Sequence, residues 1–337
     1  MVRFERDFLL KNYNTFGLSA KCKYFFEFTE EEDLPVFLSS FEEWKTMAYL
    51  FLGCGSNLLF VEDFNGIVFH PNIPGIKLVD EDEKHVWIEV GAGETWDDLV
   101  EYTVNKGYGG FENLSLIPGK VGASAVQNIG AYGVEIGDMI EHVKGFDLQS
   151  FEFCLIPVDK CDYSYRNSVF KKYLFQRFIV TSVIYRLDKY PAFKLDYGDL
   201  LKEITGEPDI RAIREAVIKI RQRKLPDTKR VGSAGSFFKN PVISGDKVRS
   251  IQISYPDVPI YPLENDSFKV AAGWLIDMCG WKGFRNGDAG VHENQALVIV
   301  NFGNATGKQL VKLANEIKES VLNRFGIELE PEVQIIL

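Results

Sequence analysis

Hydrophobic and polar positions divide this chain into strand-like and helix-like segments that follow one another without a repeat. The apolar run 47–52 ends in Gly53-Cys54-Gly55-Ser56-Asn57, and apolar residues resume at 58–60, which predicts a strand, a turn and a second strand. Residues 85–90 alternate between apolar and polar side chains and predict a further strand. The chain is therefore expected to mix helices with strands.

Three helices are predicted from apolar spacing and capping residues. The first follows Glu94 or Thr95 and turns Leu99 and Tyr102 inward. The second follows the cap Asp209, and its inward residues at helical spacing are Ile210, Ile213, Val217 and Ile220. The third covers 306–325 before a stop at Gly326, and its inward residues are Leu310, Leu313, Ile317 and Val321.

The last eleven residues, 327–337, alternate and predict a terminal strand. One face would carry the apolar residues Ile327, Leu329, Val333 and Ile335, and the other face would carry Glu332. Glutamates on such a strand are usually solvated, so the pattern by itself gives Glu332 no special role.

Length and charge narrow the class of protein. A chain of 337 residues is expected to form about two or three domains, and 46% hydrophobic with 26% charged residues is typical of a soluble globular protein. A net charge of -10 argues against a general nucleic-acid or anionic-membrane binder, since both need a basic surface. The N-terminus lacks a signal-peptide pattern and no apolar run reaches roughly 20 residues, so we expect a cytoplasmic location.

Cysteine and histidine give little sign of metal chemistry. The five cysteines are scattered without C-x-x-C spacing, which predicts reduced thiols. The four histidines show no ligand spacing with one another or with cysteine, so no metal site is expected.

Two glycine-rich segments are candidates for binding a phosphorylated ligand. Gly53, Gly55, Ser56 and Asn57 form a turn between strands, whereas a Rossmann fingerprint would need a third glycine and a helix. Such a turn can still offer backbone N–H groups to a phosphate, and a plain tight hairpin is the alternative.

The second glycine-rich segment, 116–133, is longer. Its small residues predict a backbone that lies against a flat or phosphorylated ligand. Glycines without a ligand contact would cost conformational entropy on folding with no compensating interaction. The candidate contacts here are Gly119, Gly122, Ser124, Gln127, Asn128, Gly130 and Ala131. Two phosphate-compatible loops on one chain suggest a dinucleotide.

Further candidate residues lie in three polar segments. Ser236 stands between small residues and Phe237-Phe238 in the segment 232–241, as a proton donor or ligand contact would, although a glycine-rich turn before a core strand is the alternative. Arg166 follows Tyr165, and an arginine fork suits carboxylates and phosphates. Arg221, Arg223 and Lys224 end the second predicted helix, either gripping an anion or complementing the helix dipole.

Taken in order, these segments resemble the UDP-N-acetylenolpyruvoylglucosamine reductase family nearly from end to end. The resemblance is carried by 14–17, both glycine-rich segments, Tyr165-Arg166, 235–241, 271–277, 292–297 and 330–333. It implies an α+β fold with an FAD-binding domain of the vanillyl-alcohol-oxidase type in two subdomains, 1–70 and 71–208, and a substrate-binding domain, 209–325. Residues 326–337 would complete the first subdomain. Tyr197-Gly198-Asp199-Leu200 resembles the subtype with a tyrosine-bearing substrate loop.

The resemblance also implies a reaction and residue roles. NADPH would give a hydride to bound FAD, which passes it to the enolpyruvyl double bond of UDP-N-acetylglucosamine enolpyruvate, forming UDP-N-acetylmuramate for peptidoglycan and hence for the cell wall. Ser236 would deliver the proton and Arg166 would pair with the carboxylate. Glu332 would stabilise the enolate or relay the proton, which requires it to be protonated or to share a proton. The implied substrate contacts are Tyr165, Tyr197, Lys224, Asn240 and Gln295.

Two other classes stay open. An FAD oxidase of the same fold would have no reason for the set Arg166, Ser236 and Glu332. A nucleotide-sugar binder without catalysis would have no reason to keep all three. The expected enzyme is a monomer whose partner is a small molecule, with neither nucleic acid nor membrane.

Overall fold

The computed structural model describes all 337 residues and divides the chain into two compact units. The first unit contains 1–8, 22–54 and 65–221, and the second contains 9–21, 55–64 and 222–337. The chain therefore passes between the units several times. The expected division into three parts with boundaries at 70, 208 and 325 stays a prediction.

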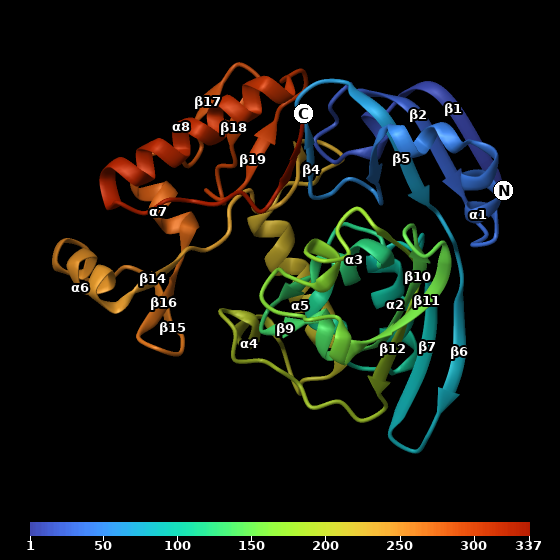
Figure 1. Cartoon of the computed structure of the whole chain (residues 1–337). Helices are drawn as coiled ribbons and strands as arrows, with labels where there is room; N and C mark the ends of the chain where they lie inside the picture. Colours follow the sequence, from blue (N-terminus) through green and yellow to red (C-terminus); the bar gives the residue numbers. More distant parts are fainter. The chain divides into compact units, whose positions relative to one another are not determined.

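The first unit contains a five-stranded antiparallel sheet with two helices against it (Figure 1). The strands, in spatial order, are β11 (Glu152–Pro157), β10 (Ile140–Asp147), β12 (Phe178–Asp188), β7 (His85–Gly91) and β6 (Ile76–Glu81). The helices are α2 (Trp96–Lys106) and α3 (Val121–Gln127). Alternate residues of β7, such as Val86, Ile88 and Val90, are buried against Trp96 and Leu99 of α2, and this packing forms the core.

A four-stranded sheet begins the same unit. Its order is β1 (Val2–Leu9), β2 (Lys21–Phe28), β5 (Phe64–Pro71) and β3 (Ala48–Phe51), and α1 (Asp33–Ser40) covers one face. The core is aromatic, and the rings of Phe26 and Phe37 stack with centroids 3.7 Å apart. The first unit also holds the short pair β8 (Gly130–Ala131) and β9 (Val134–Glu135), and α4 (Leu200–Glu203).

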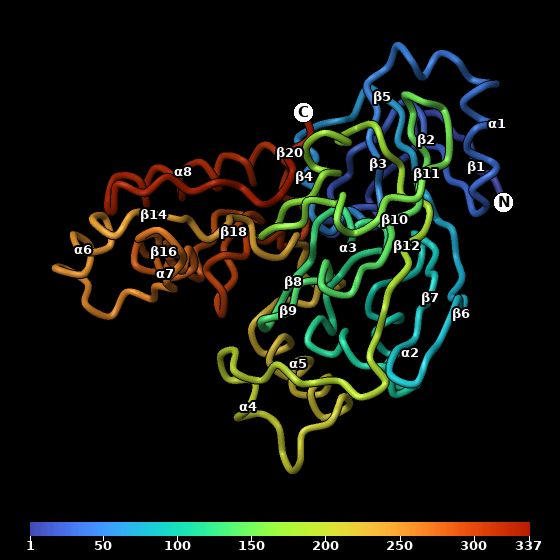
Figure 2. The backbone as a smooth tube through the Cα atoms, turned by 60° about the horizontal axis from the view of Figure 1, so that its bottom comes forward, coloured from blue at the N-terminus to red at the C-terminus, as the bar shows by residue number.

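The second unit is built from three small sheets and three helices. The first sheet has the order β13 (Gly232–Ser233), β19 (Ile299–Asn301), β18 (Ala289–Val291) and β17 (Arg285–Asn286). The second has the order β14 (Val242–Ser244), β16 (Ser267–Val270) and β15 (Ile260–Pro262). The third pairs β20 (Gln334–Ile336) with β4 (Leu58–Phe60). The helices are α6 (Gly245–Ser254), α7 (Ala272–Met278) and α8 (Gly307–Phe325). Strand β20 lies parallel to β4, so the end of the chain pairs with residues near 60 (Figure 2).

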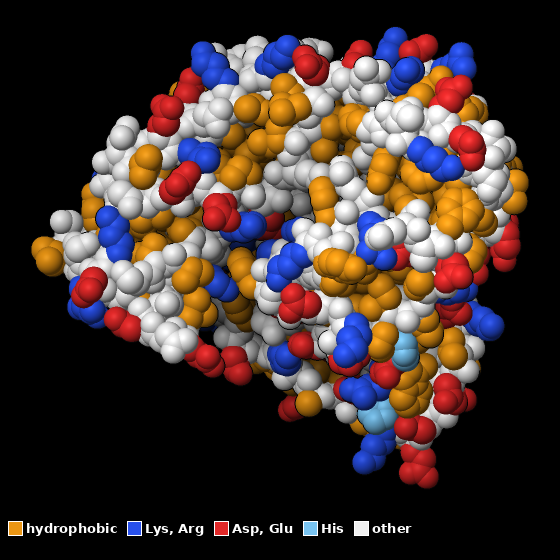
Figure 3. Space-filling model, in the orientation of Figure 1, with side chains coloured by type: hydrophobic (Ala, Val, Ile, Leu, Met, Phe, Trp, Pro, Cys, Tyr) orange, Lys and Arg blue, Asp and Glu red, His pale blue; other side chains and the backbone are white.

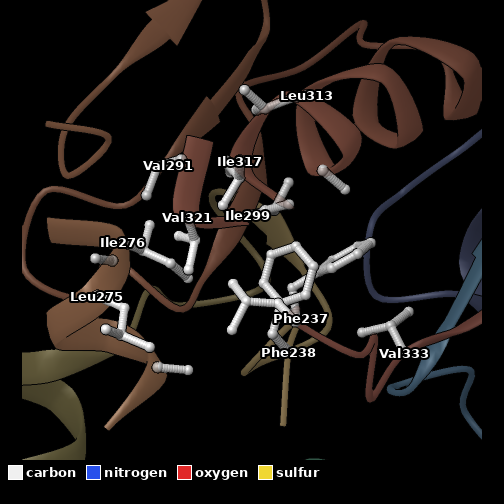
Figure 4. Close-up of a cluster of buried hydrophobic side chains, with 14 of the residues drawn as sticks. Phe237, Phe238, Leu275, Ile276, Val291, Ile299, Leu313, Ile317, Val321 and Val333 are labelled. Atoms are coloured by element: carbon white, nitrogen blue, oxygen red, sulfur yellow. The ribbon is translucent and has the colours of Figure 1, made fainter. Parts of the chain in front are cut away.

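The core of the second unit gathers around α8. Ile317 and Val321 of α8 lie beside Ile276 of α7, with Phe237 and Phe238 in the same cluster (Figure 4). Both phenylalanines are only 1% exposed. The segment around Ser236 is thus anchored by two rings that point into this core.

Helix caps explain why the predicted helices begin and end where they do. Asp209 accepts a hydrogen bond from the backbone of Ala212 (2.7 Å) at the start of α5 (Ile210–Lys224). Thr306 and Gln309 form a reciprocal capping box before α8, and Gly326 ends that helix with a φ of +62°. Both helices are confirmed.

Two expectations from the pattern are wrong in detail. Leu99 is buried as predicted, but Tyr102 is 37% exposed, because the inward face of α2 continues with Thr103 and Val104. The terminal segment is no continuous strand: only Gln334–Ile336 forms β20, and Ile336 rather than Ile335 is buried. Residues 327–333 bury apolar side chains in irregular backbone, which an alternation cannot distinguish from a strand.

No helix of the protein has the length and apolar composition needed to cross a membrane. Acidic and basic side chains are interspersed over the face seen in Figure 3. The net charge of -10 is therefore not gathered into one patch on that face.

Candidate functional site

The first glycine turn and the second glycine-rich segment meet inside the first unit. An added Cβ at Gly53 would lie 3.4 Å from Cβ of Lys120 and 3.5 Å from Cβ of Ala123, at the beginning of α3. The segment before α3 is held by backbone bonds, because the N–H of Val121 donates to Glu94 (3.0 Å) and that of Gly122 donates to Ala92 (3.1 Å). Two segments that are about 65 residues apart in sequence are thus brought side by side.

The remainder of the first glycine turn belongs to the second unit. Gly55 has a φ of +63°, and an added Cβ would lie 2.2 Å from the carbonyl oxygen of Tyr13, so no other residue fits there. The side chain of Asn57 donates to the backbone oxygen of Glu332 (3.1 Å), and the Gln334 N–H donates to the Asn57 oxygen (3.0 Å). The turn therefore borders the segment that carries Glu332.

Ser236 and Glu332 lie on neighbouring segments of the second unit. The N–H of Glu332 donates to the oxygen of Phe237 (2.8 Å), and the N–H of Lys239 donates to the oxygen of Glu330 (2.9 Å). Ser236 and Glu332 are both half-buried. Two residues that are 96 positions apart in sequence, one with a hydroxyl and one with a carboxyl, thus lie on adjoining backbone segments.

The two residues that follow Ser236 belong to the core of the second unit. The rings of Phe237 and Phe238 point into the core around α8 (Figure 4). Gly235 has a φ of +69°, a conformation that favours glycine, and Ser236 after it is half-buried whereas both rings are buried.

The predicted substrate residues of the second unit differ in their surroundings. Asn240 accepts a hydrogen bond from the backbone of Ala272 (2.9 Å) at the start of α7, so its side-chain oxygen already caps this helix. The side-chain oxygen of Gln295 accepts from the backbone of Leu297 (3.3 Å). Lys224 is exposed at the end of α5. Lys224 is thus charged and exposed to solvent, whereas Asn240 and Gln295 are neutral and half-buried.

Arg166 lies in the first unit at the tip of a tight turn. Ser164 and Asn167 exchange two backbone hydrogen bonds (3.1 and 2.9 Å), which leaves Tyr165 and Arg166 between them. Arg166 has a φ of +55°, a conformation that a residue with a side chain adopts at a cost. Its guanidinium donates to the backbone oxygen of Gly130 (2.8 Å).

The neighbourhood of Arg166 contains further residues with left-handed backbone. Asn128 has a φ of +46° and Tyr132 a φ of +49°. The ring of Tyr132 meets that of Tyr197 edge to face, with centroids 6.1 Å apart. Tyr197, which is 54% exposed, is thereby placed near the arginine turn, within the same unit. Such a concentration of strained backbone is typical of functional sites.

Two predicted cofactor contacts use their side chains inside the protein. Asn128 is 1% exposed and donates to Glu135 (2.7 Å) and to the Ser164 oxygen (3.0 Å), which joins the glycine segment to the arginine turn. Ser124 is 3% exposed and donates to the Val121 oxygen (2.7 Å). Any contact of these two residues with a cofactor has to come from their backbone. Gln127, by contrast, accepts from Lys171 (3.2 Å) at the edge of the cluster.

Close packing of neighbouring atoms explains why positions 122 and 130 are glycines. A Cβ at Gly122 would lie 2.8 Å from Cβ of Ala92, inside the core beneath α3. A Cβ at Gly130 would lie 3.0 Å from the Glu135 side chain and 3.2 Å from the Arg166 guanidinium. Gly130 therefore lets Arg166 approach the backbone closely.

Several residues of these clusters are not predicted from the sequence. Lys171 donates to the backbone oxygen of Arg166 (2.9 Å) and supports the turn, although no motif marks it. His70 is buried behind the first glycine turn, where its Nδ1 lies 2.6 Å from the Leu52 oxygen and its Nε2 lies 3.4 Å from Glu27. Burial lowers the pKa of His70 below its ordinary value.

A polar pocket of about 430 Å³ was also not predicted. It lies in the second unit, and its cationic residues are Lys11, Lys229 and Arg230. Thr15, which lines it, donates through its N–H to the oxygen of Gly55 (3.3 Å), so the pocket adjoins the first glycine turn. Three cations beside a glycine turn have the donor chemistry that a diphosphate needs.

Two family models match the chain. The model described as FAD binding domain matches residues 23–149, and the model described as UDP-N-acetylenolpyruvoylglucosamine reductase, C-terminal domain, matches residues 226–336. The two matches confirm FAD as the cofactor and the expected α+β class of an FAD-binding domain joined to a second domain.

Full-length relatives carry the same description. The UDP-N-acetylenolpyruvoylglucosamine reductase of Flavobacterium johnsoniae is 43% identical over 340 residues, covering 99% of this chain and 100% of that protein. The Porphyromonas gingivalis reductase is 45% identical over 337 residues, covering 98% and 99%. A solved structure, the reductase (MurB) from Thermus caldophilus, matches with a TM-score of 0.70 and 27% identity over 100% of both chains. The chain therefore belongs to the UDP-N-acetylenolpyruvoylglucosamine reductase family, FAD-dependent oxidoreductases of peptidoglycan precursor synthesis.

Proposed function

We propose that this protein reduces UDP-N-acetylglucosamine enolpyruvate to UDP-N-acetylmuramate, with NADPH as the hydride donor and with named residues of both units in the reaction. The observation that carries the proposal is the backbone hydrogen bond from Glu332 to Phe237, the residue after Ser236, in a family member that has Arg166 on a strained turn. FAD, when bound, supplies the hydride chemistry, while the protein supplies position and charge.

The residues around both glycine segments fit FAD. Gly53 packs on the residues that open α3, and the cationic pocket lined by Lys11, Lys229 and Arg230 adjoins Gly55. Backbone N–H groups of Gly55, Ser56 and Asn57 would bind the phosphates beside this pocket. The segment from Gly119 to Ala131 is a further proposed contact of FAD.

Ser236 gives a proton to the carbon next to the substrate's carboxylate. Hydride addition to the methylene carbon leaves negative charge on that neighbouring carbon and on the carboxylate, so a positioned acid is needed there. Glu332 shares or relays this proton, and the support is that its backbone N–H donates to the oxygen of Phe237, the residue after Ser236. This role requires Glu332 to be protonated or to share a proton, since an ionised carboxylate would repel the developing charge.

Arg166 pairs with the substrate's carboxylate and draws off the charge that develops during reduction. Its turn is braced by Lys171 and its guanidinium by the Gly130 oxygen, which leaves it little freedom to reorganise. Tyr165 and Tyr197 line the approach to this arginine, and Tyr197 is exposed enough to fold over a ligand.

Lys224 and Tyr197 hold the substrate's diphosphate, together with the amide groups of Asn240 and Gln295. The exposed ammonium of Lys224 provides the positive charge. The side-chain amides of Asn240 and Gln295 are held in position by the hydrogen bonds that they accept from the backbone of Ala272 and Leu297. We further propose that the enzyme works as a monomer in the cytoplasm, where NADPH and nucleotide sugars are made.

Product analysis tests this function. Purified protein is mixed with FAD, NADPH and UDP-N-acetylglucosamine enolpyruvate, and we expect one NADPH consumed for each product molecule that is heavier by two hydrogen atoms. UDP-N-acetylglucosamine, which lacks the double bond, is the control and should consume none. An oxidase would consume NADPH with oxygen regardless of the sugar, and a binder without catalysis would consume none with either sugar.

A further inference from the structure

One buried asparagine of the first unit joins two segments that are distant in sequence. Asn113 lies in the short 3-10 helix Glu112–Leu114 and is 1% exposed. Its side-chain amide donates to the backbone oxygen of Tyr132 (2.9 Å) and to that of Lys194 (2.8 Å). A side-chain amide has two hydrogens to donate, so one is available for each of these segments.

The short helix that carries Asn113 is itself fixed by the core. The indole of Trp96 donates to the oxygen of Leu114 (2.9 Å), and the hydroxyl of Ser115 donates to the oxygen of Glu112 (2.7 Å). Trp96 is fully buried. Asn113 therefore offers its amide from a rigid base.

The first partner of Asn113 belongs to the second glycine-rich segment. Tyr132 directly follows Ala131, and its φ of +49° is a conformation that the surrounding structure has to hold in place. The ring of Tyr132 meets that of Tyr197 edge to face, with centroids 6.1 Å apart. A Cβ added at Gly133 would lie 3.8 Å from Cβ of Tyr197. The glycine-rich segment and Tyr197 are thus in contact at this point.

The second partner of Asn113 lies in the connection that carries Tyr197. Strand β12 ends at Asp188, and residues 189–199 form neither helix nor strand. Such a connection lacks the regular backbone bonds of a helix or sheet, so side-chain contacts decide how firmly it is held. Asn113 holds it at Lys194, three positions before Tyr197.

We propose that Asn113 is a positioning residue, which holds the Tyr197 connection against the glycine-rich segment and so places Tyr197 for the diphosphate of the nucleotide sugar. The inference rests on the proposed function, in which Tyr197 holds that diphosphate. The amide of Asn113 is buried and bonded to backbone, so it acts through Tyr197 and takes no part in proton or hydride transfer. A connection that is ordered before the ligand arrives lowers the entropy cost of binding.

Two variants of the FAD-loaded enzyme remove the bridge in different ways. Asn113→Asp keeps the shape of the side chain but loses both amide hydrogens, and Asn113→Ser is too short to reach both oxygens. Thr103→Val is the matched control for a loss of stability alone. Thr103 is fully buried in the same unit, and its hydroxyl donates within its own helix to the oxygen of Val100 (3.0 Å).

Limited digestion with trypsin measures how firmly the connection is held. Lys194 is exposed, so the peptide bond that follows it is a trypsin site. We expect cleavage there to be roughly 5- to 10-fold faster in Asn113→Asp than in the parent, because the bonds that close this backbone are lost. Cleavage at Lys282, in an exposed turn of the second unit, should not change. Thr103→Val should be cut like the parent at both sites.

Binding and rate measurements separate a positioning role from a role in the chemistry. Calorimetry should show UDP-N-acetylglucosamine bound roughly 5- to 10-fold more weakly by Asn113→Asp. The half-saturating concentration of the enolpyruvyl substrate in flavin reoxidation should rise by the same factor, while the limiting rate stays at the parent's value. In a Tyr197→Ala background, Asn113→Asp should weaken binding little further, because the residue acts through Tyr197.

A folded Asn113→Asp protein with the parent's affinity would overturn the proposal, whether or not Lys194 is cut faster. An equal loss of affinity in Thr103→Val, or full additivity with Tyr197→Ala, would overturn it as well. If Asn113→Asp does not fold, Asn113→Ser decides by the same measurements. The parent's own flavin cycle is recorded first, so a failure of the proposed reductase function is seen there. Digestion and calorimetry need no turnover and report on Asn113 separately.

Discussion

At the scale of single residues, the account depends on what each side chain can reach. Ser236 is half-buried beside two phenylalanines of the core, and its segment adjoins that of Glu332. A hydroxyl in this position can serve the proton transfer without taking part in hydride transfer between NADPH and FAD.

Ser236→Ala should therefore separate the two half-reactions. We expect flavin reduction by NADPH at the parent's rate and reoxidation by the enolpyruvyl substrate slowed by roughly 10²–10⁴-fold, because a positioned acid is lost. Rapid-mixing absorbance follows each half-reaction separately. Ser236→Cys is the control and should recover part of the rate, since a thiol can still donate a proton. Equal slowing of both half-reactions in Ser236→Ala would make Ser236 a structural residue.

Lys224 is exposed at the end of α5, where a cation also complements the helix dipole. If it grips the diphosphate, Lys224→Ala should weaken nucleotide-sugar binding by at least about 10-fold, since a charged hydrogen bond contributes about 1.5–3 kcal/mol. Flavin content should not change. Calorimetry with UDP-N-acetylglucosamine checks the affinity, with Lys219→Ala as a matched exposed cation. Unchanged affinity in Lys224→Ala would leave only the dipole role.

At the scale of elements, the glycine segments owe part of their composition to packing. Gly122 faces Ala92 beneath α3, and Gly55 faces the Tyr13 backbone. Loss of FAD on replacing such a glycine would therefore report a disturbed fold as well as a blocked cofactor.

Gly122→Val should destabilise the first unit by more than Gly53→Ala does. The added Cβ lies 2.8 Å from Ala92 at position 122 but no closer than 3.4 Å to any atom at position 53. Thermal unfolding in the absence of FAD measures this effect apart from cofactor binding. A Gly122→Val protein with the parent's melting temperature would show that α3 can move to make room for the larger side chain. Ligand contact alone would then explain why position 122 is glycine.

An element could be predicted from the sequence where residues close in the chain mark its ends, and not where tertiary packing decides its structure. Helix α8 was predicted at both ends because Thr306 and Gly326 cap it through their own neighbours. The segment after it was predicted as a strand, since alternation over 327–333 resembles one, but these side chains are buried by tertiary packing.

The same limit applies to the site. Ser236, Arg166 and the glycine segments stood in recognisable motifs, whereas the neighbours that hold them did not. Tyr132, Asn128 and Ser124 make side-chain contacts with residues 36 to 89 positions away, and Lys171 supports Arg166 from five positions away without belonging to any motif. No periodicity or spacing in one sequence encodes such contacts.

At the scale of the whole molecule, stability should depend on pH through His70. The pKa of His70 in the folded protein is below the ordinary 6.5. As the pH falls through 6.5, the unfolded chain binds this proton first, so the stabilisation present at neutral pH is lost progressively towards the lower folded pKa.

His70→Asn keeps a donor for the Leu52 oxygen but does not titrate. We expect its free energy of unfolding, measured in urea at pH 7.5 and at pH 5.5, to change less with pH than that of the parent. An identical pH dependence in the two proteins would mean that His70 does not contribute to it.

The central claim is that one protein passes electrons from NADPH to the enolpyruvyl sugar through FAD. An anaerobic titration followed by absorbance tests it most directly. NADPH should bleach the oxidised flavin band, and UDP-N-acetylglucosamine enolpyruvate should then restore it without oxygen, one equivalent for each flavin. A bleached protein that regains colour only when air is admitted, or a protein that NADPH never bleaches, would contradict the account.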